Sequence, residues 1–145
     1  MKMLCFGSLN LDKVYRVPHF VMPGETLSSQ ELKSFCGGKG LNQSIALACA
    51  GCPVYMAGKV GQDGDVLLQR LKEKGVDISY VGRGQGASGH AIIQVEETGQ
   101  NCILLYGGAN QQIDKDYIDQ VLSHFEKGDF LLLQNEISSM EYLIS

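Results

Sequence analysis

Residues 35–51, FCGGKGLNQSIALACAG, contain the change of pattern that decides the fold. The preceding segment, Val14–Phe35, holds short β-like pieces broken by proline and glycine. From Gly38 onward, apolar residues recur at the spacing of one helical face, at Leu41, Ile45, Ala48 and Cys49. We therefore predict a helix from about Gly38 to Ala50 that ends at Gly51.

Strands and helices alternate on both sides of this segment. Short apolar runs predict strands at Lys2–Ser8, Val54–Ala57, Ile78–Val81 and Phe130–Leu133. Amphipathic patterns predict one helix over Val66–Lys74 and another that Asp114 caps and Gly128 closes. Phe130–Leu133 is continuously apolar, which is typical of a strand covered on both faces. The alternation predicts an α/β fold with a mostly parallel central sheet flanked by helices.

Two segments interrupt this alternation. One is Val14–Phe35, and the other, Ala91–Tyr106, has the pattern of a hairpin around the polar turn Glu96–Gly99. We predict that these segments form a separate, small antiparallel sheet.

Composition excludes several classes of protein. The chain has 145 residues and a net charge of −4 without any basic stretch, which argues against nucleic acid as a partner. No apolar stretch is long enough to span a membrane. Five cysteines and the lack of a signal-peptide pattern at the N-terminus predict reduced thiols and a cytoplasmic location.

The C-terminal residues predict a helix that the chain does not complete. Ser138–Glu141 has the form of a capping box, and apolar Leu143 and Ile144 follow it. The sequence stops at Ser145, before two helical turns have formed. We expect the chain to be a fragment that ends in the middle of a βα unit.

Polar side chains gather where the predicted strands end. Asn10 and Asp12 lie two residues apart at the end of the first strand, and Glu136 has the same place after Phe130–Leu133. Lys39 and Asn42 share a face at the start of the predicted helix. Ligands of open α/β sheets bind at the carboxyl ends of the strands, so we expect these five residues to form one hydroxyl-binding cleft. Two other interpretations remain open: an Asx turn at Asn10 and Asp12, and Gly38 as a plain N-cap beside a solvated Lys39.

Six motifs in order resemble the N-terminal half of the ribokinase-like branch of the PfkB family of carbohydrate kinases. They are GSLNLD (7–12), PGET (23–26), GGKGLNQ (37–43), GQDG (61–64), GGAN (107–110) and LLQNE (132–136). The resemblance extends over residues 1–145. It implies a ribokinase-like fold in which this chain is the N-terminal part and the C-terminal, ATP-binding half is absent.

The resemblance also implies a function and a site. The expected reaction is transfer of the γ-phosphoryl group of ATP to a sugar hydroxyl, O5 of D-ribose first, with Mg²⁺ and K⁺ as further cofactors. The implied sugar ligands are Asn10, Asp12, Gly38, Lys39, Asn42 and Glu136. Ala91 and Ile93 would contact the sugar from a lid made of segments 13–36 and 89–107. In relatives that lid sheet also pairs two subunits, so the full-length protein is expected to be a homodimer.

The chain departs from the family in its second half. The GAGD motif, whose Asp is the general base, and the NxxE magnesium motif do not occur. We therefore expect no catalytic or metal-binding residue in this chain and no kinase activity from it alone. The alternatives are a non-catalytic sugar-binding or dimerising module, and a kinase for another sugar or for a nucleoside.

Overall fold

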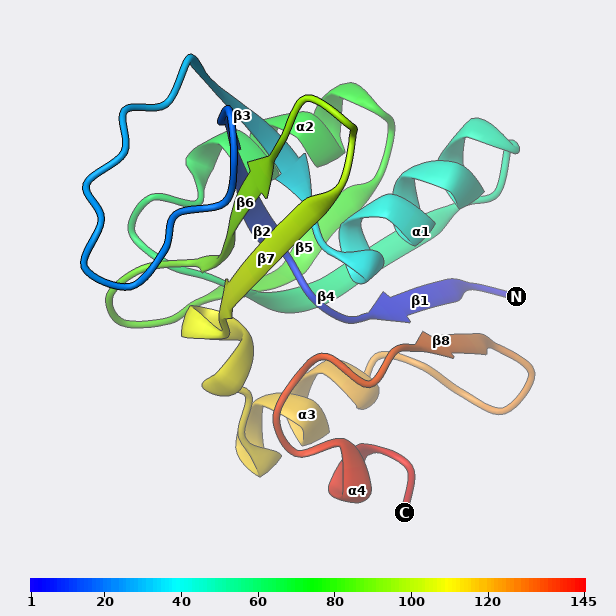
Figure 1. The fold of residues 1–145 in the computed structure, drawn as a ribbon. Helices are drawn as coiled ribbons and strands as arrows, with labels where there is room; N and C mark the ends of the chain where they lie inside the picture. Colours follow the sequence, from blue (N-terminus) through cyan, green and yellow to red (C-terminus); the bar gives the residue numbers. More distant parts are fainter.

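Two four-stranded sheets organise the chain, and the computed structural model describes all residues from Met1 to Ser145 (Figure 1). The first sheet consists of β1 (Met3–Phe6), β4 (Val54–Val60), β5 (Asp77–Arg83) and β8 (Phe130–Leu133). The second consists of β2 (Asn10–Arg16), β3 (Glu31–Gly37), β6 (Gly89–Val95) and β7 (Asn101–Tyr106). The helices are α1 (Lys39–Cys49), α2 (Asp65–Glu73), the 3₁₀ helix η1 (Gly108–Gln111), α3 (Lys115–Leu122) and α4 (Met140–Leu143).

The first sheet is parallel and has helices on both faces, as the alternation predicted. Its strand order is β5-β4-β1-β8. Leu41 of α1 and Leu67 of α2 pack in one core cluster with Cys5 and Met56, whereas Ile118 of α3 packs in a second cluster on the other face. The sheet with its helices is called the body below. No helix is long and apolar enough to cross a membrane.

The strand order reverses direction at β1. The chain adds β4 and β5 on one side of β1 and later adds β8 on the other side. The connections after β1 and after β8 therefore diverge at the same edge of the sheet. Such a switch point is the usual ligand site of an open α/β sheet.

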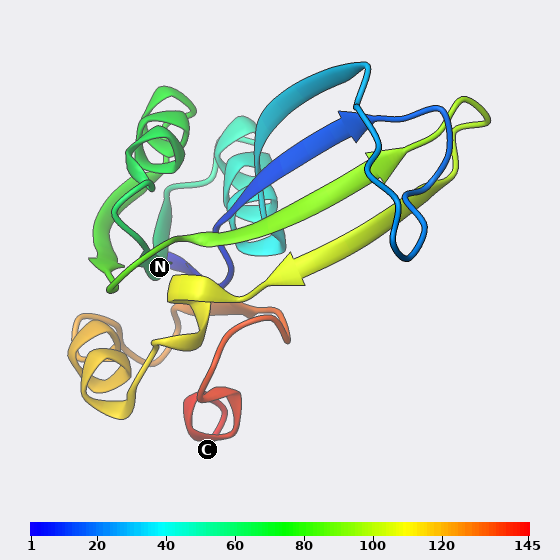
Figure 2. The ribbon, with the colours of Figure 1, turned by 60° about the vertical axis from the view of Figure 1, so that its left-hand side comes forward.

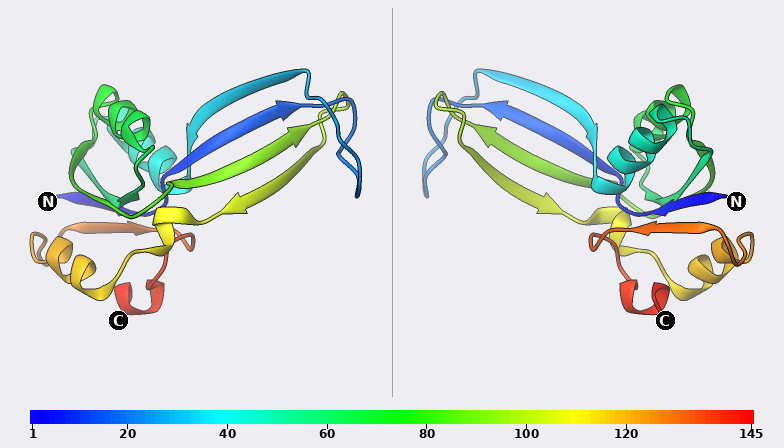
Figure 3. Two further views of the ribbon diagram at one scale, coloured as in Figure 1. Left: turned by 90° about the vertical axis from the view of Figure 1, so that its left-hand side faces the viewer. Right: turned by 90° about the vertical axis from the view of Figure 1, so that its right-hand side faces the viewer.

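The second sheet projects from the body, and both chain termini lie in the body (Figures 2 and 3). Its order is β3-β2-β6-β7, and it is mixed rather than antiparallel as predicted, because its two central strands, β2 and β6, run parallel. The reason is that β2 follows β1 and β6 follows β5. Both strands leave the body in the same direction, so they can pair only in parallel.

Two predictions for the C-terminal third, the end of α3 and the burial of β8, need correction. α3 begins at the predicted cap, where Asp114 Oδ1 accepts from Tyr117 N, but it ends at Leu122 instead of reaching Gly128. Phe125 lies beyond the helix and packs edge-on against Tyr55 and Tyr80. β8 is not covered on both faces. It is an edge strand, and 55% of Phe130 is exposed.

The predicted capping box does not form. Ser138 Oγ donates to Ile113 O and accepts from Ile113 N, so it is not free to cap a helix. The residue that precedes α4 is Ser139, which has a φ of 59° and makes no side-chain cap. Tertiary bonds to the η1–α3 connection have replaced the local bond that the sequence pattern predicts.

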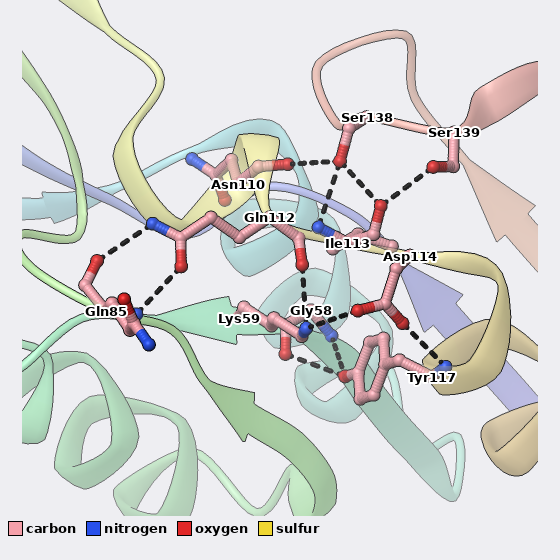
Figure 4. Close-up of polar contacts among 10 residues, drawn as sticks. All are labelled: Gly58, Lys59, Gln85, Asn110, Gln112, Ile113, Asp114, Tyr117, Ser138 and Ser139. Carbon is pink, nitrogen blue, oxygen red and sulfur yellow. Dashed lines mark hydrogen bonds and ion pairs between the residues drawn. The ribbon is translucent and has the colours of Figure 1, made fainter.

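Tyr117 joins α3 to the first sheet (Figure 4). Its hydroxyl accepts from Gly58 N at 2.9 Å and donates toward Gly58 O and Tyr80 O, at 2.8 and 2.6 Å. These backbone groups lie next to the point where the register between β4 and β5 shifts, between Tyr55 and Ala57. Burial raises the pKa of Tyr117 to about 12. One side-chain hydroxyl thus bonds to both β4 and β5 beside an irregularity in the sheet.

We expect Tyr117→Phe to lower the free energy of unfolding by about 1–3 kcal/mol, because it removes a buried hydroxyl that bonds to backbone groups of two strands. Urea unfolding at pH 7 measures this loss, and Tyr106→Phe, at a side chain that is 56% exposed, is the matched control. The raised pKa means that the folded state holds the Tyr117 proton more tightly. The stability that Tyr117 contributes should therefore be lost as the pH rises from 10 through 12. The difference in the free energy of unfolding between the native chain and Tyr117→Phe should decrease over this range. Equal unfolding midpoints for the two variants at pH 7 would contradict the assignment.

Candidate functional site

All eight residues implied as ligand contacts line one pocket of about 200 Å³. Six are the polar and glycine residues Asn10, Asp12, Gly38, Lys39, Asn42 and Glu136, and two are the apolar residues Ala91 and Ile93. The pocket lies where the second sheet meets the switch point of the first. Its volume is below the range of about 300–1,000 Å³ that is usual for drug-sized ligands, which suits a small metabolite.

Asn10 and Asp12 belong to β2 and not to the end of the first strand. β1 ends at Phe6, and Gly7–Leu9 connect it to β2. Side chains alternate along a strand, so Asn10 and Asp12 share a face as expected. The Asx-turn interpretation is therefore wrong, because both residues are paired in the sheet with β3 and β6.

The start of α1 is pressed against the β1–β2 connection. Gly38 has a φ of +95°, and a Cβ there would lie 2.7 Å from Ser8 O. A Cβ on Gly40 would lie 2.6 Å from Gly7 C. Leu41 N donates to Ser8 O at 3.0 Å. Glycine is required at both positions because the helix end and the connection touch through their backbones.

Lys39 is paired and not merely solvated. Gly38 is the N-cap of α1, as the simpler interpretation held, but Lys39 Nζ lies 2.9 Å from Glu136 Oε1. The Lys39 side chain is still 66% exposed, and Lys39 lines the pocket. An exposed pair of this kind contributes little to stability. Its consequence is to place a cation and an anion side by side at the mouth of the pocket.

Ser8 holds the other oxygen of Glu136. Ser8 is 1% exposed, and its Oγ donates to Glu136 Oε2 at 2.7 Å. Burial raises the pKa of Glu136, but hydrogen bonds from Ser8 and Lys39 and the Lys39 charge outweigh it and hold the pKa below its usual 4.5. Glu136 is therefore a fixed, ionised hydrogen-bond acceptor.

Asp12 has the opposite shift. Burial raises its pKa above the usual 3.8, and the negative charge of Glu136 raises it further. The two carboxylates thus face the same small volume. Ligand groups that donate hydrogen bonds would relieve this repulsion, and vicinal hydroxyls supply such donors.

Sequence reasoning missed three residues of the site. Ile103 and Leu105 of β7 line the pocket beside Ile93 and Ala91, their partners in the hairpin ladder. The predicted hairpin could have revealed them, because they are the residues opposite the two apolar contacts that were identified. Ser8 is part of the GSLNLD motif, but no local pattern indicates that its hydroxyl meets a residue 128 positions away.

A second pocket, of about 480 Å³, adjoins the first. The two share Asn10, Lys39, Leu105 and Glu136, and the larger one continues toward Tyr106 and Asn135. No group of three or more His, Cys, Asp or Glu side chains lies close enough in the chain to hold a metal ion. The two pockets together form one polar site that Asn10, Lys39 and Glu136 connect.

Comparison with known proteins agrees with this arrangement. The sequence matches the family described as pfkB family carbohydrate kinase over residues 1–142. The chain belongs to the PfkB family of carbohydrate kinases. The ribokinase of Staphylococcus aureus (strain COL) is 36% identical over 140 residues, which are 94% of this chain and 46% of that protein.

Solved PfkB-family structures show the same fold. A ribokinase from Cryptococcus neoformans var. grubii serotype A, in complex with ADP, superposes with a TM-score of 0.82 at 34% identity, covering 99% of this chain and 43% of that one. The Arabidopsis thaliana ribokinase complexed with ribose and ATP gives a TM-score of 0.79 at 30% identity, covering 94% and 46%. This chain spans less than half the length of these relatives.

For this PfkB-family chain we expect Ser8→Ala to raise the pKa of Glu136, because the substitution removes a hydrogen bond to the ionised form. NMR titration of the ¹³C-labelled carboxyl groups measures the shift in the free chain, and Ser34→Ala on the exposed part of β3 is the control. In the native chain Glu136 should titrate below 4.5, and this contribution to stability should be lost as the pH falls through its folded value. An unchanged Glu136 titration in the Ser8 variant would show that the hydroxyl does not hold the carboxylate.

The same titration tests the coupling of the two carboxylates. Glu136→Gln should lower the pKa of Asp12, because a neighbouring negative charge disfavours its ionisation. The pKa should stay above 3.8, since burial is the larger cause of the shift. Glu141→Gln, a carboxylate in α4 outside the pocket, is the charge-matched control. If both variants move Asp12 equally, the two carboxylates do not share the pocket.

Proposed function

We propose that this chain is the sugar-binding part of an ATP-dependent sugar kinase whose acceptor is D-ribose, phosphorylated at O5. The observation that carries the proposal is the convergence of two carboxylates, an ammonium group, two amides and an apolar wall on one pocket of about 200 Å³. The fold and the family support it, and so does the ribose bound to the Arabidopsis relative.

The polar residues match a polyol by type. Asp12 and Glu136 accept hydrogen bonds from hydroxyl groups, whereas Lys39, Asn10 and Asn42 donate to hydroxyl oxygens. A ligand that lacks one hydroxyl would leave a desolvated partner in the pocket, which costs free energy. Selectivity for a sugar therefore follows from satisfying all five side chains together.

The second sheet supplies the apolar side. Ala91, Ile93, Ile103 and Leu105 would pack against the C–H face of the sugar ring. We propose that the sheet, with segments 13–36 and 89–107, acts as a lid. Closing such a lid excludes water, so that the phosphoryl group passes to the sugar and not to solvent.

The phosphoryl donor and the base are proposed to lie in the half of the domain that this chain does not match. In this proposal the 145-residue chain contributes the acceptor site, and the groups that hold Mg²⁺ and the ATP phosphates come from that other half. When bound, MgATP would supply the γ-phosphoryl group. We propose K⁺ as a further cofactor of the kinase. Phosphoryl transfer depends on positioning and charge stabilisation, so we expect no turnover from the isolated chain.

Assembly and location belong to the same proposal. Apart from the residues that line the pocket, the second sheet exposes the large apolar side chains of Leu32, Phe35, Leu104 and Tyr106. Apolar surface of this kind supports pairing of two subunits through the lid sheet, as a homodimer. Five free cysteines support a cytoplasmic location.

Calorimetric titration of the chain with D-ribose tests the proposal. We expect ribose to bind and Asp12→Asn to weaken it by about tenfold or more, because a charged acceptor is lost. Asp116→Asn, an exposed carboxylate of α3, should leave binding unchanged. A chain that binds no ribose, or binds it equally after Asp12→Asn, would overturn the proposed site. A nucleoside or 2-deoxyribose that binds tighter than ribose would overturn the assigned substrate.

Turnover separates the kinase from a binding module. The protein that contains both halves should form ADP from MgATP only when ribose is present, and the 145-residue chain should form none. Ribose binding without ribose-dependent ADP formation in the longer protein would refute the kinase proposal.

A further inference from the structure

Asn110 is a buried polar residue outside the set of predicted ligand contacts. It lies in η1, is 2% exposed, and uses its side-chain amide on the β1–β2 connection. Asn110 Oδ1 accepts from Leu9 N at 3.0 Å, and Nδ2 donates to Leu9 O at 3.3 Å. The same Nδ2 donates to Asn10 Oδ1 at 2.7 Å. An amide that bonds both backbone groups of one residue is held in a single orientation.

The orientation of Asn110 determines that of Asn10. A backbone N–H can only donate, so the Asn110 oxygen must face Leu9 N and its nitrogen must face the other way. That nitrogen can only donate, so the Asn10 atom in front of it must be Oδ1. Asn10 Nδ2 then has no partner within the chain, and Asn10 lines both pockets. The Leu9 N–H donor thus fixes the orientation of the Asn110 amide, which in turn fixes that of Asn10. The Asn10 NH₂ group is left as the donor available to a ligand.

We propose that Asn110 is a positioning residue that fixes Asn10 as a hydrogen-bond donor to the ligand. The ligand atom that meets Asn10 must then be an acceptor oxygen. If that oxygen belongs to a hydroxyl group, its own proton is left for a carboxylate in the same pocket. This inference rests on the proposed function in taking the ligand to be a polyol.

The surroundings keep the amide pair from rearranging. Gly89, at the start of β6, lies so close to Asn110 Nδ2 and Asn10 Oδ1 that a Cβ there would collide with both. Asn110 O accepts from Ser138 N at 3.0 Å and, at 3.4 Å, from Ser138 Oγ, which ties the residue to the connection after β8 (Figure 4). The pair is therefore enclosed by β2, β6 and the segment that carries Glu136.

Side-chain amide hydrogen exchange tests the pair without any ligand. In the free, ¹⁵N-labelled chain the Asn110 NH₂ protons should exchange slowly, because both are held and buried. Asn10→Ala should speed the exchange of Asn110, whereas Val121→Ala, a core truncation on the far face of the first sheet, should not. Native Asn110 protons that exchange as fast as those of exposed Asn101 would overturn the inference.

Ribose affinity tests whether Asn10 presents a hydrogen-bond donor to the ligand. Asn10→Asp keeps an acceptor for Asn110 but presents an oxygen to the ligand, so we expect binding to weaken about ten- to a hundredfold. Asn101→Asp, at the exposed first residue of β7 and outside the pocket, is the charge-matched control and should have no effect. Asn10→Asp that binds ribose as tightly as the native chain would overturn the donor assignment.

A double-mutant cycle separates positioning from general stability. Asn110→Ala should weaken ribose binding about three- to tenfold, by releasing the Asn10 side chain. In an Asn10→Ala background it should have no further effect, because there is no amide left to orient. Equal losses in both backgrounds would show a merely structural role. If the native chain binds no ribose, the proposed function fails, and the exchange measurement alone then decides the inference.

Discussion

The contact between the first turn of α1 and the β1–β2 connection is the constraint on which the site depends. Gly38 and Gly40 allow the two backbones to touch, and Leu41 N donates to Ser8 O across the contact. This contact sets Lys39 and Asn42 over the strand that carries Asn10 and Asp12. A side chain at either glycine would push the helix away from the connection, and with it Lys39 and Asn42 away from Asn10 and Asp12.

The sequence predicted the parallel sheet, its flanking helices and the existence of a second sheet, because these depend on local periodicity. Asp114 as a helix cap was confirmed for the same reason: its partner, Tyr117 N, is three residues away. The order of strands in the second sheet could not be obtained this way. It depends on where β2 and β6 leave the body, which is a property of the fold and not of either segment.

In the site, too, local patterns predicted some residues, whereas contacts between distant residues could not be predicted. Its polar ligand candidates were predicted from the ends of strands and the start of a helix, and they do line one pocket. The residues that orient them were not predicted. Ser8 bonds to Glu136 and Asn110 bonds to Asn10 over separations of 128 and 100 residues, and neither has a characteristic spacing. Ser138 shows the converse, since a well-formed local motif lost its hydroxyl to a distant backbone group.

The parallel pair at the centre of the second sheet has a mechanical consequence. β2 and β6 both leave the body at their first residues, Asn10 and Gly89. If the sheet acts as the proposed lid, these residues lie closest to the axis about which it would turn. Any swing about that axis displaces each residue in proportion to its distance from the axis. Asn10 would then move least, and Ile93, four residues farther out along β6 than Gly89, would move more. Under the proposed lid function, the polar contacts of Asn10 would persist while the apolar residues of the sheet cover or uncover the pocket.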